Sequence, residues 1–195
     1  MTLLRSRKRR WTALLPVIAL FSLHAATAAD AVERNATWAK PIPLEGASNL
    51  FQVSDTLYRS AQPTPDGLKH LKELGIKTVI NLRAFHNDRS AAKAAELLNE
   101  ELSINTWNIE DDDVIKVLTL LKDPAGAPYL IHCQHGADRT GVMVAMYRIV
   151  YQHWTRNEAI DELVHGGYGF HSLWSNITEY LRHVDITVIN GKLPH

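Results

Sequence analysis

Cysteine is almost absent from this chain of 195 residues, which contains one, Cys133. A single thiol cannot form an internal disulfide, so no disulfide framework holds the fold. In an oxidising compartment two thiols tend to pair, whereas a lone thiol stays free for chemistry, although it can still form a sulfenic acid or a mixed disulfide. Internal repeats, low-complexity runs and an internal linker are also lacking. The length is therefore that of one domain with its own core.

The N-terminal apolar run is too short to span a bilayer comfortably. It covers residues 11–23 and follows a basic head made of Arg5, Arg7, Lys8, Arg9 and Arg10. Small residues come next, with an Ala-x-Ala pattern at 26–28. This order is typical of a secretory signal peptide. We expect residues 1–29 to be removed, leaving a periplasmic or secreted protein without a stable membrane anchor; a short uncleaved anchor is the alternative.

An excess of positive charge is missing from the expected mature chain. The full sequence balances 21 basic against 21 acidic residues, but residues 1–29 hold five of the basic residues and no acidic one. The mature part is therefore acidic, with about five net negative charges. No basic patch with interleaved aromatic residues occurs in it, so nucleic acid is not an expected partner.

One stretch places a strand, a loop and a helix around the cysteine. Tyr129–Ile131 is apolar and predicts a buried strand, and the helical spacing of apolar residues over 140–150 predicts a helix. Cys133 begins the loop between them, and Arg139 follows six positions later. Such a loop directs main-chain N–H groups and a helix N-terminus toward a bound anion.

The residue types in this loop suit the chemistry of a phosphate ester. The dipoles of the loop favour the thiolate form of a cysteine at its base, which is the nucleophilic form. The guanidinium of Arg139 offers a planar fork of donors that matches two oxygens of a phosphate. The alternative is a cysteine that only packs in a tight turn.

The run His-Cys-x5-Arg-Thr-Gly resembles the cysteine-dependent protein tyrosine phosphatase superfamily, and within it the exported dual-specificity-like (atypical) phosphatases of bacteria. Segments 57–63, 77–83 and 166–170 are also similar to the family, and the resemblance covers roughly residues 48–188. It implies an α/β fold with a central, mostly parallel sheet flanked by helices. It also implies hydrolysis of phosphate monoesters through a phosphocysteine intermediate, with no metal or other cofactor, because the loop and arginine supply the positive field.

The resemblance gives each loop residue a role. Cys133 would attack phosphorus, while Arg139 and the loop amides would hold the equatorial oxygens. Thr140 would donate its hydroxyl to the sulfur, and His132 would fix the loop through hydrogen bonds. The predicted substrate-binding residues are Gln134, His135, Gly136, Ala137, Asp138 and Arg139.

Asp138 is unexpected in this loop, because a carboxylate facing a phosphate would repel it. We expect its side chain to point away and to bind nearby backbone or a side chain outside the pocket. His132 and His135 could be read as metal ligands, but their spacing is too tight for a tetrahedral site without help from distant residues. No metal is therefore expected, and His135 should line the pocket rim.

A general acid should protonate the leaving oxygen and then activate water. In the family it lies some two to three dozen residues before the nucleophile, where this chain offers Glu110 and Asp111–Asp113. Asp111 is the prediction, with Asp112 and Glu110 next. The alternative is that these acids only complement the dipole of the helix they precede.

Elsewhere, strand and helix patterns alternate early and helices dominate late, which predicts one α/β domain. Predicted strands are 49–53, 57–60, 77–82 and 104–109. Predicted helices run from the N-cap Thr64 to Gly75, over 90–101, over the segment with Val114 to Leu121, from a capping box at 155–158 to Gly166, and over 172–184. The predicted divisions are signal peptide 1–29, extended lead-in 30–47, phosphatase-like domain 48–188 and C-terminal tail 189–195.

Some roles stay open. Arg59 and Arg83 would brace the domain through ion pairs or take part in the site, and the turn with Tyr168, Phe170 and His171 would form a pocket wall or a plain connection. Three functions compete: a phosphatase for phosphotyrosine, with phosphoserine and phosphothreonine as further substrates; a phosphatase for inositol phosphates or other small esters; and a non-catalytic module that binds phospho-ligands. Family members that favour phosphoinositides often carry lysine in this loop, and residues 134–138 contain none.

Overall fold

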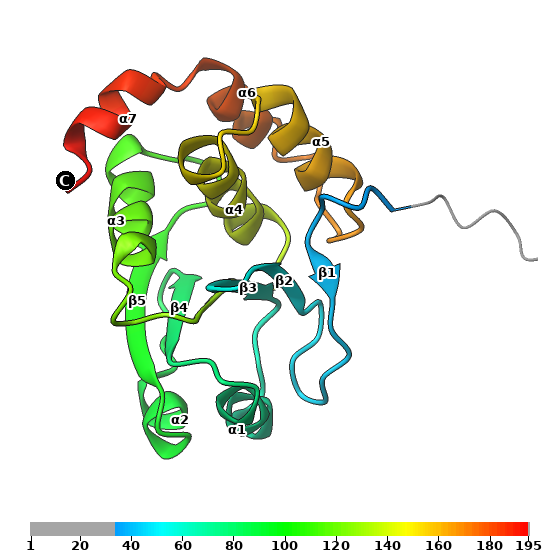
Figure 1. Cartoon of the computed structure of the whole chain (residues 1–195), viewed down its shortest axis with the longest axis vertical. Helices are drawn as coiled ribbons and strands as arrows, with labels where there is room; N and C mark the ends of the chain where they lie inside the picture. Colours follow the sequence, from blue (N-terminus) through cyan, green and yellow to red (C-terminus); the bar gives the residue numbers. More distant parts are fainter. Residues whose placement is uncertain (1–33, 195) are drawn as a thin grey trace, which may run out of the picture. The chain divides into compact units, whose positions relative to one another are not determined.

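The computed structural model describes residues 34–194, and in that part of the chain six strands form a single sheet (Figure 1). The predicted signal peptide and the first residues of the predicted lead-in lie outside the described residues. The strands are β1 (Lys40–Pro41), β2 (Phe51–Ser54), β3 (Leu57–Ser60), β4 (Thr78–Arg83), β5 (Leu98–Ile104) and β6 (Tyr129–His132). The helices are α1 (Pro65–Glu73), α2 (Arg89–Ala94), α3 (Asp111–Lys122), α4 (Asp138–Tyr151), α5 (Arg156–His165), α6 (Ser175–His183) and α7 (Ile186–Lys192).

The sheet order is β1-β2-β3-β6-β4-β5. Strand β6 pairs in parallel with β3 and with β4, and β4 pairs in parallel with β5, whereas β1 and β2 are added antiparallel at one edge. The predicted α/β class with a mostly parallel sheet is confirmed. Because β6 has a neighbour on each side, the loop that follows it starts from the middle of the sheet.

Helices cover both faces of the sheet, with α1 and α2 on one face and α3 to α7 on the other (Figure 1). Alternate residues of the strands supply two separate cores, as the period of two in a strand requires. Ile80 and Ile131 point into the core beneath α3 to α7, while Val79 and Leu130 point into the core over α1 and α2. Continuous apolar strands are expected where a sheet is covered on both faces.

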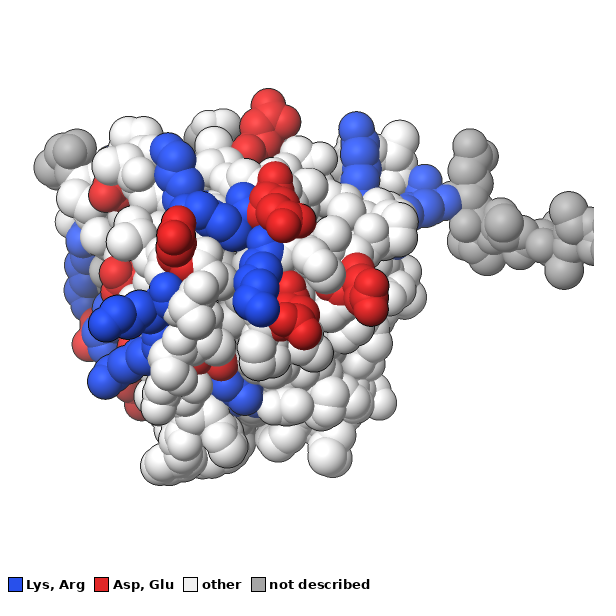
Figure 2. Space-filling model, turned by 90° about the horizontal axis from the view of Figure 1, so that it is seen from below, with Lys and Arg blue, Asp and Glu red and all other residues white. Residues whose placement is uncertain are grey.

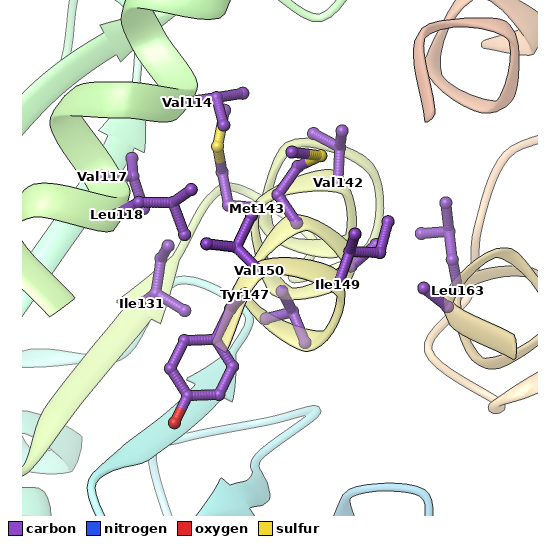
Figure 3. Close-up of a cluster of buried hydrophobic side chains, with 14 of the residues drawn as sticks. Val114, Val117, Leu118, Ile131, Val142, Met143, Tyr147, Ile149, Val150 and Leu163 are labelled. Carbon is purple, nitrogen blue, oxygen red and sulfur yellow. The ribbon is translucent and has the colours of Figure 1, made fainter. Parts of the chain in front are cut away.

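Helix α4 lies in the larger core and is buried on all sides from Thr140 to Val150. Figure 3 shows Val114, Val117 and Leu118 of α3 on one flank of α4 and Leu163 of α5 on the other. A helix that is apolar all round is a core helix. Helix α4, which follows the loop of Cys133, is thus packed against other elements on several sides.

Two predicted helix starts are confirmed in detail. The Thr64 hydroxyl accepts a hydrogen bond from the main-chain N–H of Gly67, and Pro65 is the first helical residue of α1. At α5, Thr155 and Glu158 form the predicted capping box, in which each side chain bonds the other's main-chain N–H.

The predicted helix over 90–101 is confirmed only in its first part, because α2 covers Arg89–Ala94, and the predicted strand over 104–109 is wrong. Helix α2 ends at Ala94, because Glu96 turns the chain with a left-handed φ of 56°. The following residues, Leu98–Ile104, form the edge strand β5 along β4. Hydrogen bonding to β4 overrides the helix preference of this Leu- and Glu-rich segment. Residues 105–109 form a turn instead of a strand.

The C-terminal region also differs from prediction. The helix expected over 172–184 begins later, at Ser175, and a further helix, α7, follows it. The boundary drawn between the domain and a tail, at 188/189, falls inside α7, whose Ile189 is part of the larger core together with Leu193. The signal that was missed is the Asp185 N-cap, which accepts hydrogen bonds from Thr187 and Val188.

Basic and acidic side chains are interspersed on the face shown in Figure 2. Some opposite charges also pair along one helix, as Lys69 and Asp66 of α1 do at 2.8 Å. Within residues 34–194 no helix has the length and apolar character needed to cross a bilayer.

Candidate active site

Cys133 lies directly after β6, at the carboxyl end of the parallel strands, where ligands bind in open α/β sheets. The residue is 2% exposed. A loop over residues 133–137 connects it to α4, whose first turn carries Asp138, Arg139 and Thr140. The predicted strand-loop-helix arrangement is therefore present, with the thiol at its base.

The carbonyl groups of the loop are held from behind. Those of residues 134, 135 and 136 accept hydrogen bonds from the Gln62 N–H (3.2 Å), the Asn49 amide (2.8 Å) and the Arg59 guanidinium (2.7 Å). A carbonyl and the next N–H point in opposite directions across a trans peptide. The N–H groups of residues 135–137 therefore point to the inner side of the loop. No group within residues 34–194 accepts a hydrogen bond from the main-chain N–H groups of 134–139. Converging free amides of this kind bind anions.

Gly136 permits the tight curvature of the loop. Its φ of +69° is in the left-handed region. A β-carbon built there would lie 2.5 Å from the main-chain carbonyl of Ser60, at the end of β3. The loop packs so closely on the neighbouring strand that glycine is required for space as well as for conformation.

Arg59 supports the loop from within the core. Its guanidinium donates to the Gly136 carbonyl and stacks 3.6 Å from the ring centroid of Tyr168. Burial lowers the pKa of Arg59, although Tyr168 and Glu162 oppose this effect. The Tyr168 hydroxyl donates to Glu162, which is also paired with Arg148 at 2.7 Å. Burial raises the pKa of Tyr168 to about 12. Arg59 is thus a brace, but it acts through a carbonyl and a ring and not through an ion pair.

His132 connects the loop to a buried polar cluster. Its Nε2 lies 3.0 Å from an oxygen of Asp88, within ion-pair distance but not aligned as a hydrogen bond, and its Nδ1 lies 3.3 Å from the Cys133 carbonyl. Asp88 also accepts hydrogen bonds from Arg83 (2.9 Å) and Gln62 (3.0 Å). Burial alone would raise the pKa of Asp88, but these partners outweigh it and hold that pKa below its ordinary value. These contacts fix the His132 ring, and its role in holding the loop stays a prediction drawn from the family resemblance.

Asp138 binds the turn after α5. Its carboxylate accepts hydrogen bonds from the main-chain N–H of His171 (3.0 Å) and from the His171 ring (2.9 Å). The His171 ring lies beside the ring of His135, with 5.4 Å between centroids. The turn over 166–171 therefore flanks the loop as a wall, and the Asp138 carboxylate is committed to that wall.

Arg139 and Thr140 occupy the first turn of α4. Arg139 is half-buried, and Thr140 is fully buried. The Thr140 hydroxyl has no hydrogen-bond partner among residues 34–194, so the bond to the Cys133 sulfur that the family resemblance implies is not formed in this structure. The roles of Cys133, Arg139 and Thr140 stay predictions drawn from the motif.

Each acid predicted as a proton donor has a partner. Asp111 accepts a hydrogen bond from the Tyr180 hydroxyl of α6 (2.8 Å). Glu110 accepts one from the Asn108 amide (2.7 Å), and Asp112 lies 3.7 Å from the Lys192 ammonium. Asp111 is the least exposed of these three acids. Burial and the bond to Asp111 raise the pKa of Tyr180, so its phenol stays protonated and holds that carboxylate. The assignment of Asp111 stays a prediction.

Three residues that position the loop were missed from the sequence: Asn49, Gln62 and Asp88. Gln62 falls within the segment 57–63 that carries the family resemblance, so it could have been found there. Asn49 adopts a left-handed φ of 55°, and Asp88 follows an irregular segment. Neither Asn49 nor Asp88 lies in a local sequence pattern that indicates a role at the loop.

Comparison with known proteins agrees with this architecture. Residues 44–172 match the family model described as "DSP-PTPase phosphatase fused to NAD+ Kinase". The chain is 35% identical to the dual specificity protein phosphatase TpbA of Pseudomonas aeruginosa over 165 residues, which cover 84% of this chain and 73% of that protein. An inositol diphosphatase of Arabidopsis thaliana is 31% identical over 125 residues, covering 59% of this chain and 60% of that protein.

Solved structures of related phosphatases share this fold. The crystal structure of P. aeruginosa TpbA superposes with a TM-score of 0.71 at 34% identity, over 80% of this chain and 95% of that chain. A TpbA structure in complex with phosphotyrosine superposes with a TM-score of 0.71 at 33% identity, over the same shares. The chain belongs to the DSP-PTPase family and is a cysteine-dependent phosphatase of the tyrosine and dual-specificity type.

Proposed function

We propose that this phosphatase hydrolyses phosphotyrosine in proteins outside the cytoplasm, with Cys133 as its nucleophile. The observation that carries the proposal is the loop above Cys133, whose three bound carbonyls direct the intervening amides inward. Arg139 adds a guanidinium at the same loop. Together they form a site for the three equatorial oxygens of a transferring phosphoryl group.

The reaction has two steps. The Cys133 thiolate attacks phosphorus in line, so that a sulfur–phosphorus bond forms as the bond to the tyrosine oxygen breaks; Asp111 gives that oxygen its proton. Water then attacks phosphorus, Asp111 takes a proton from the water, and the sulfur–phosphorus bond breaks. Phosphate leaves and the thiolate is restored, so no oxidant or reductant is needed.

Small phosphate esters of inositol are the second candidate. The observation that favours them is the 31% identity to a protein named as an inositol diphosphatase. Against them, residues 134–138 of this chain contain no lysine to bind the additional phosphates. The similarity to TpbA extends over more of this chain than the similarity to the inositol diphosphatase, and we therefore give preference to phosphotyrosine.

Turnover of p-nitrophenyl phosphate in the presence of a chelator tests the chemistry. We expect activity that vanadate inhibits and that Cys133→Ser abolishes. A panel of tyrosine, serine and threonine phosphopeptides compared with inositol phosphates then tests the substrate. A higher kcat/KM for tyrosine phosphopeptides supports the proposal, and preferred turnover of inositol phosphates overturns it.

The proton donor is tested with leaving groups of different quality. Asp111→Asn should slow esters with poor leaving groups much more than esters with good ones, because only the former need protonation. Asp112→Asn and Glu110→Gln are the matched controls. If either control shows the larger dependence on the leaving group, Asp111 is the wrong acid.

Export rests on the basic head, apolar run and small residues of 1–29. Mass spectrometry of the protein recovered from the periplasm or medium should show an N-terminus near residue 30. Recovery of the intact chain from the cytoplasm alone would overturn this part of the proposal.

A further inference from the structure

A group of potential metal ligands lies on the wall of the loop. His135, Asp138 and His171 each offer one ligand atom, and these atoms lie within 4.8 Å of one another. Two imidazoles and a carboxylate are the donor set that zinc and similar divalent metals accept at sites with an open position. The close spacing around Cys133 excludes a tetrahedral site from the loop residues alone, and the structure supplies the distant residue, His171, which such a site needs.

We propose that His135, Asp138 and His171 form a binding site for one divalent transition-metal ion of the zinc class. The site lies beyond the proposed phosphatase reaction, in which no step is assigned to a metal. It joins the loop of the nucleophile to the turn over 166–171.

The geometry is close to that of a bound site. A tetrahedral zinc ion with bonds of about 2.0–2.2 Å holds its ligand atoms roughly 3.4 Å apart. The Asp138 oxygen and the His171 Nδ1 are 2.9 Å apart, so these two atoms need to separate only slightly to admit the ion. Only the His135 ring must approach, and because His135 is exposed its ring can turn without disturbing the core.

Asp138 is the fixed ligand of the group. Its side chain is 9% exposed, and its other oxygen accepts the main-chain N–H of His171 at 3.0 Å. Such outer contacts orient a ligating carboxylate before the metal arrives. The ion would lie between the Asp138 oxygen and the His171 Nδ1 in place of their hydrogen bond, and the fourth position would stay open to water.

Zinc binding to the untagged mature chain in a Cys133→Ser background tests the site, because this background removes the only thiol. Isothermal titration calorimetry should give one zinc ion per chain, and cobalt should give the visible absorption of a tetrahedral complex. His135→Ala and His171→Ala should each weaken binding at least about tenfold. The matched control is His165→Ala, which removes an exposed histidine paired with Asp161 at 2.6 Å, and it should leave the affinity unchanged.

Thermal unfolding provides a second readout for variants that fold less well. Zinc should raise the Tm of the Cys133→Ser protein, because a ligand of the native state stabilises it, and His135→Ala should abolish this increase. The proposal is overturned if zinc binds only when the Cys133 thiol is present. It is also overturned if the three alanine variants bind zinc equally well.

Discussion

Gly136 has a left-handed φ of +69°, and a β-carbon added there would lie 2.5 Å from the Ser60 carbonyl. Gly136→Ala should cost at least about 2 kcal/mol of unfolding free energy through backbone strain and overlap. It should lower kcat/KM about a hundredfold, because the amides move. Chemical denaturation and steady-state kinetics measure both.

Gly75→Ala is the control for backbone strain alone. Gly75 has a φ of +100°, but nothing lies within 4 Å of the added carbon. It should lose about 1 kcal/mol of stability and keep its turnover. Equal kinetic losses in the two variants would show that the effect at Gly136 is general and does not concern the loop.

A substitution at Arg139 tests whether catalysis needs the paired donors of the guanidinium in addition to its positive charge. Arg139→Lys keeps the positive charge but removes the paired donors. It should lower kcat on phosphotyrosine peptides roughly 10²–10³-fold, the usual loss on removing a group that stabilises the charge of a transition state. Arg182→Lys, at an exposed position of α6, is the control. A loss of less than tenfold would show that charge alone is enough.

The sequence could predict single residues of the loop but not their supports. Cys133 and Arg139 are six positions apart, between a strand pattern and a helix pattern. This combination identifies the loop more specifically than the spacing alone. Asn49 reaches the loop from 86 residues away along the chain. Asp88 reaches it from the connection between β4 and α2. Contacts of this kind depend on the folded topology, and no local pattern records them.

Helices α4 and α5 are joined by a buried ion pair between Arg148 and Glu162. Arg148→Met leaves Glu162 buried without its cation, which should cost about 3–5 kcal/mol of unfolding free energy. The exposed pair of Arg182 and Glu179 is the control, and Arg182→Met should change stability by less than about 1 kcal/mol. Urea denaturation distinguishes them; similar losses would contradict the role given to the buried pair.

Strand β5 shows where element prediction fails. Leu98–Ile104 has the composition of a helix, yet it hydrogen bonds along β4 as the edge strand of the sheet. In contrast, α1 and α5 were predicted correctly at their starts, because Thr64 and Thr155 cap the helices through local bonds. Local chemistry is readable from the sequence, whereas pairing across the sheet is not.

At the scale of the whole molecule, buried carboxylates should make the fold sensitive to acid. Burial alone would raise the pKa of Glu162. The hydrogen bonds from Arg148, Ala39 and Tyr168 and the charge of Arg148 outweigh burial, so the folded-state pKa is below its ordinary value of 4.5. The stabilisation from Glu162 is therefore complete above about pH 4.5 and is lost as the pH falls through the lower, folded-state pKa. The pKa of Asp88 is also lowered in the folded state, so its contribution to stability is likewise lost at acid pH.

Urea denaturation between pH 7 and pH 3 measures this dependence. The free energy of unfolding of the natural chain should fall below about pH 4.5, and Glu162→Gln should be less stable at pH 7 but show a shallower decline. If both proteins decline in parallel, Glu162 does not carry the acid sensitivity.

The most direct measurement is the identification of the covalent intermediate. Because Cys133 is the only cysteine, rapid acid quench of the enzyme with a phosphotyrosine peptide, followed by mass spectrometry, can place the phosphoryl group without ambiguity. We predict one phosphoryl group on the peptide that contains Cys133, formed and lost at rates consistent with turnover. Turnover without any phosphocysteine, together with an active Cys133→Ser variant, would contradict the account.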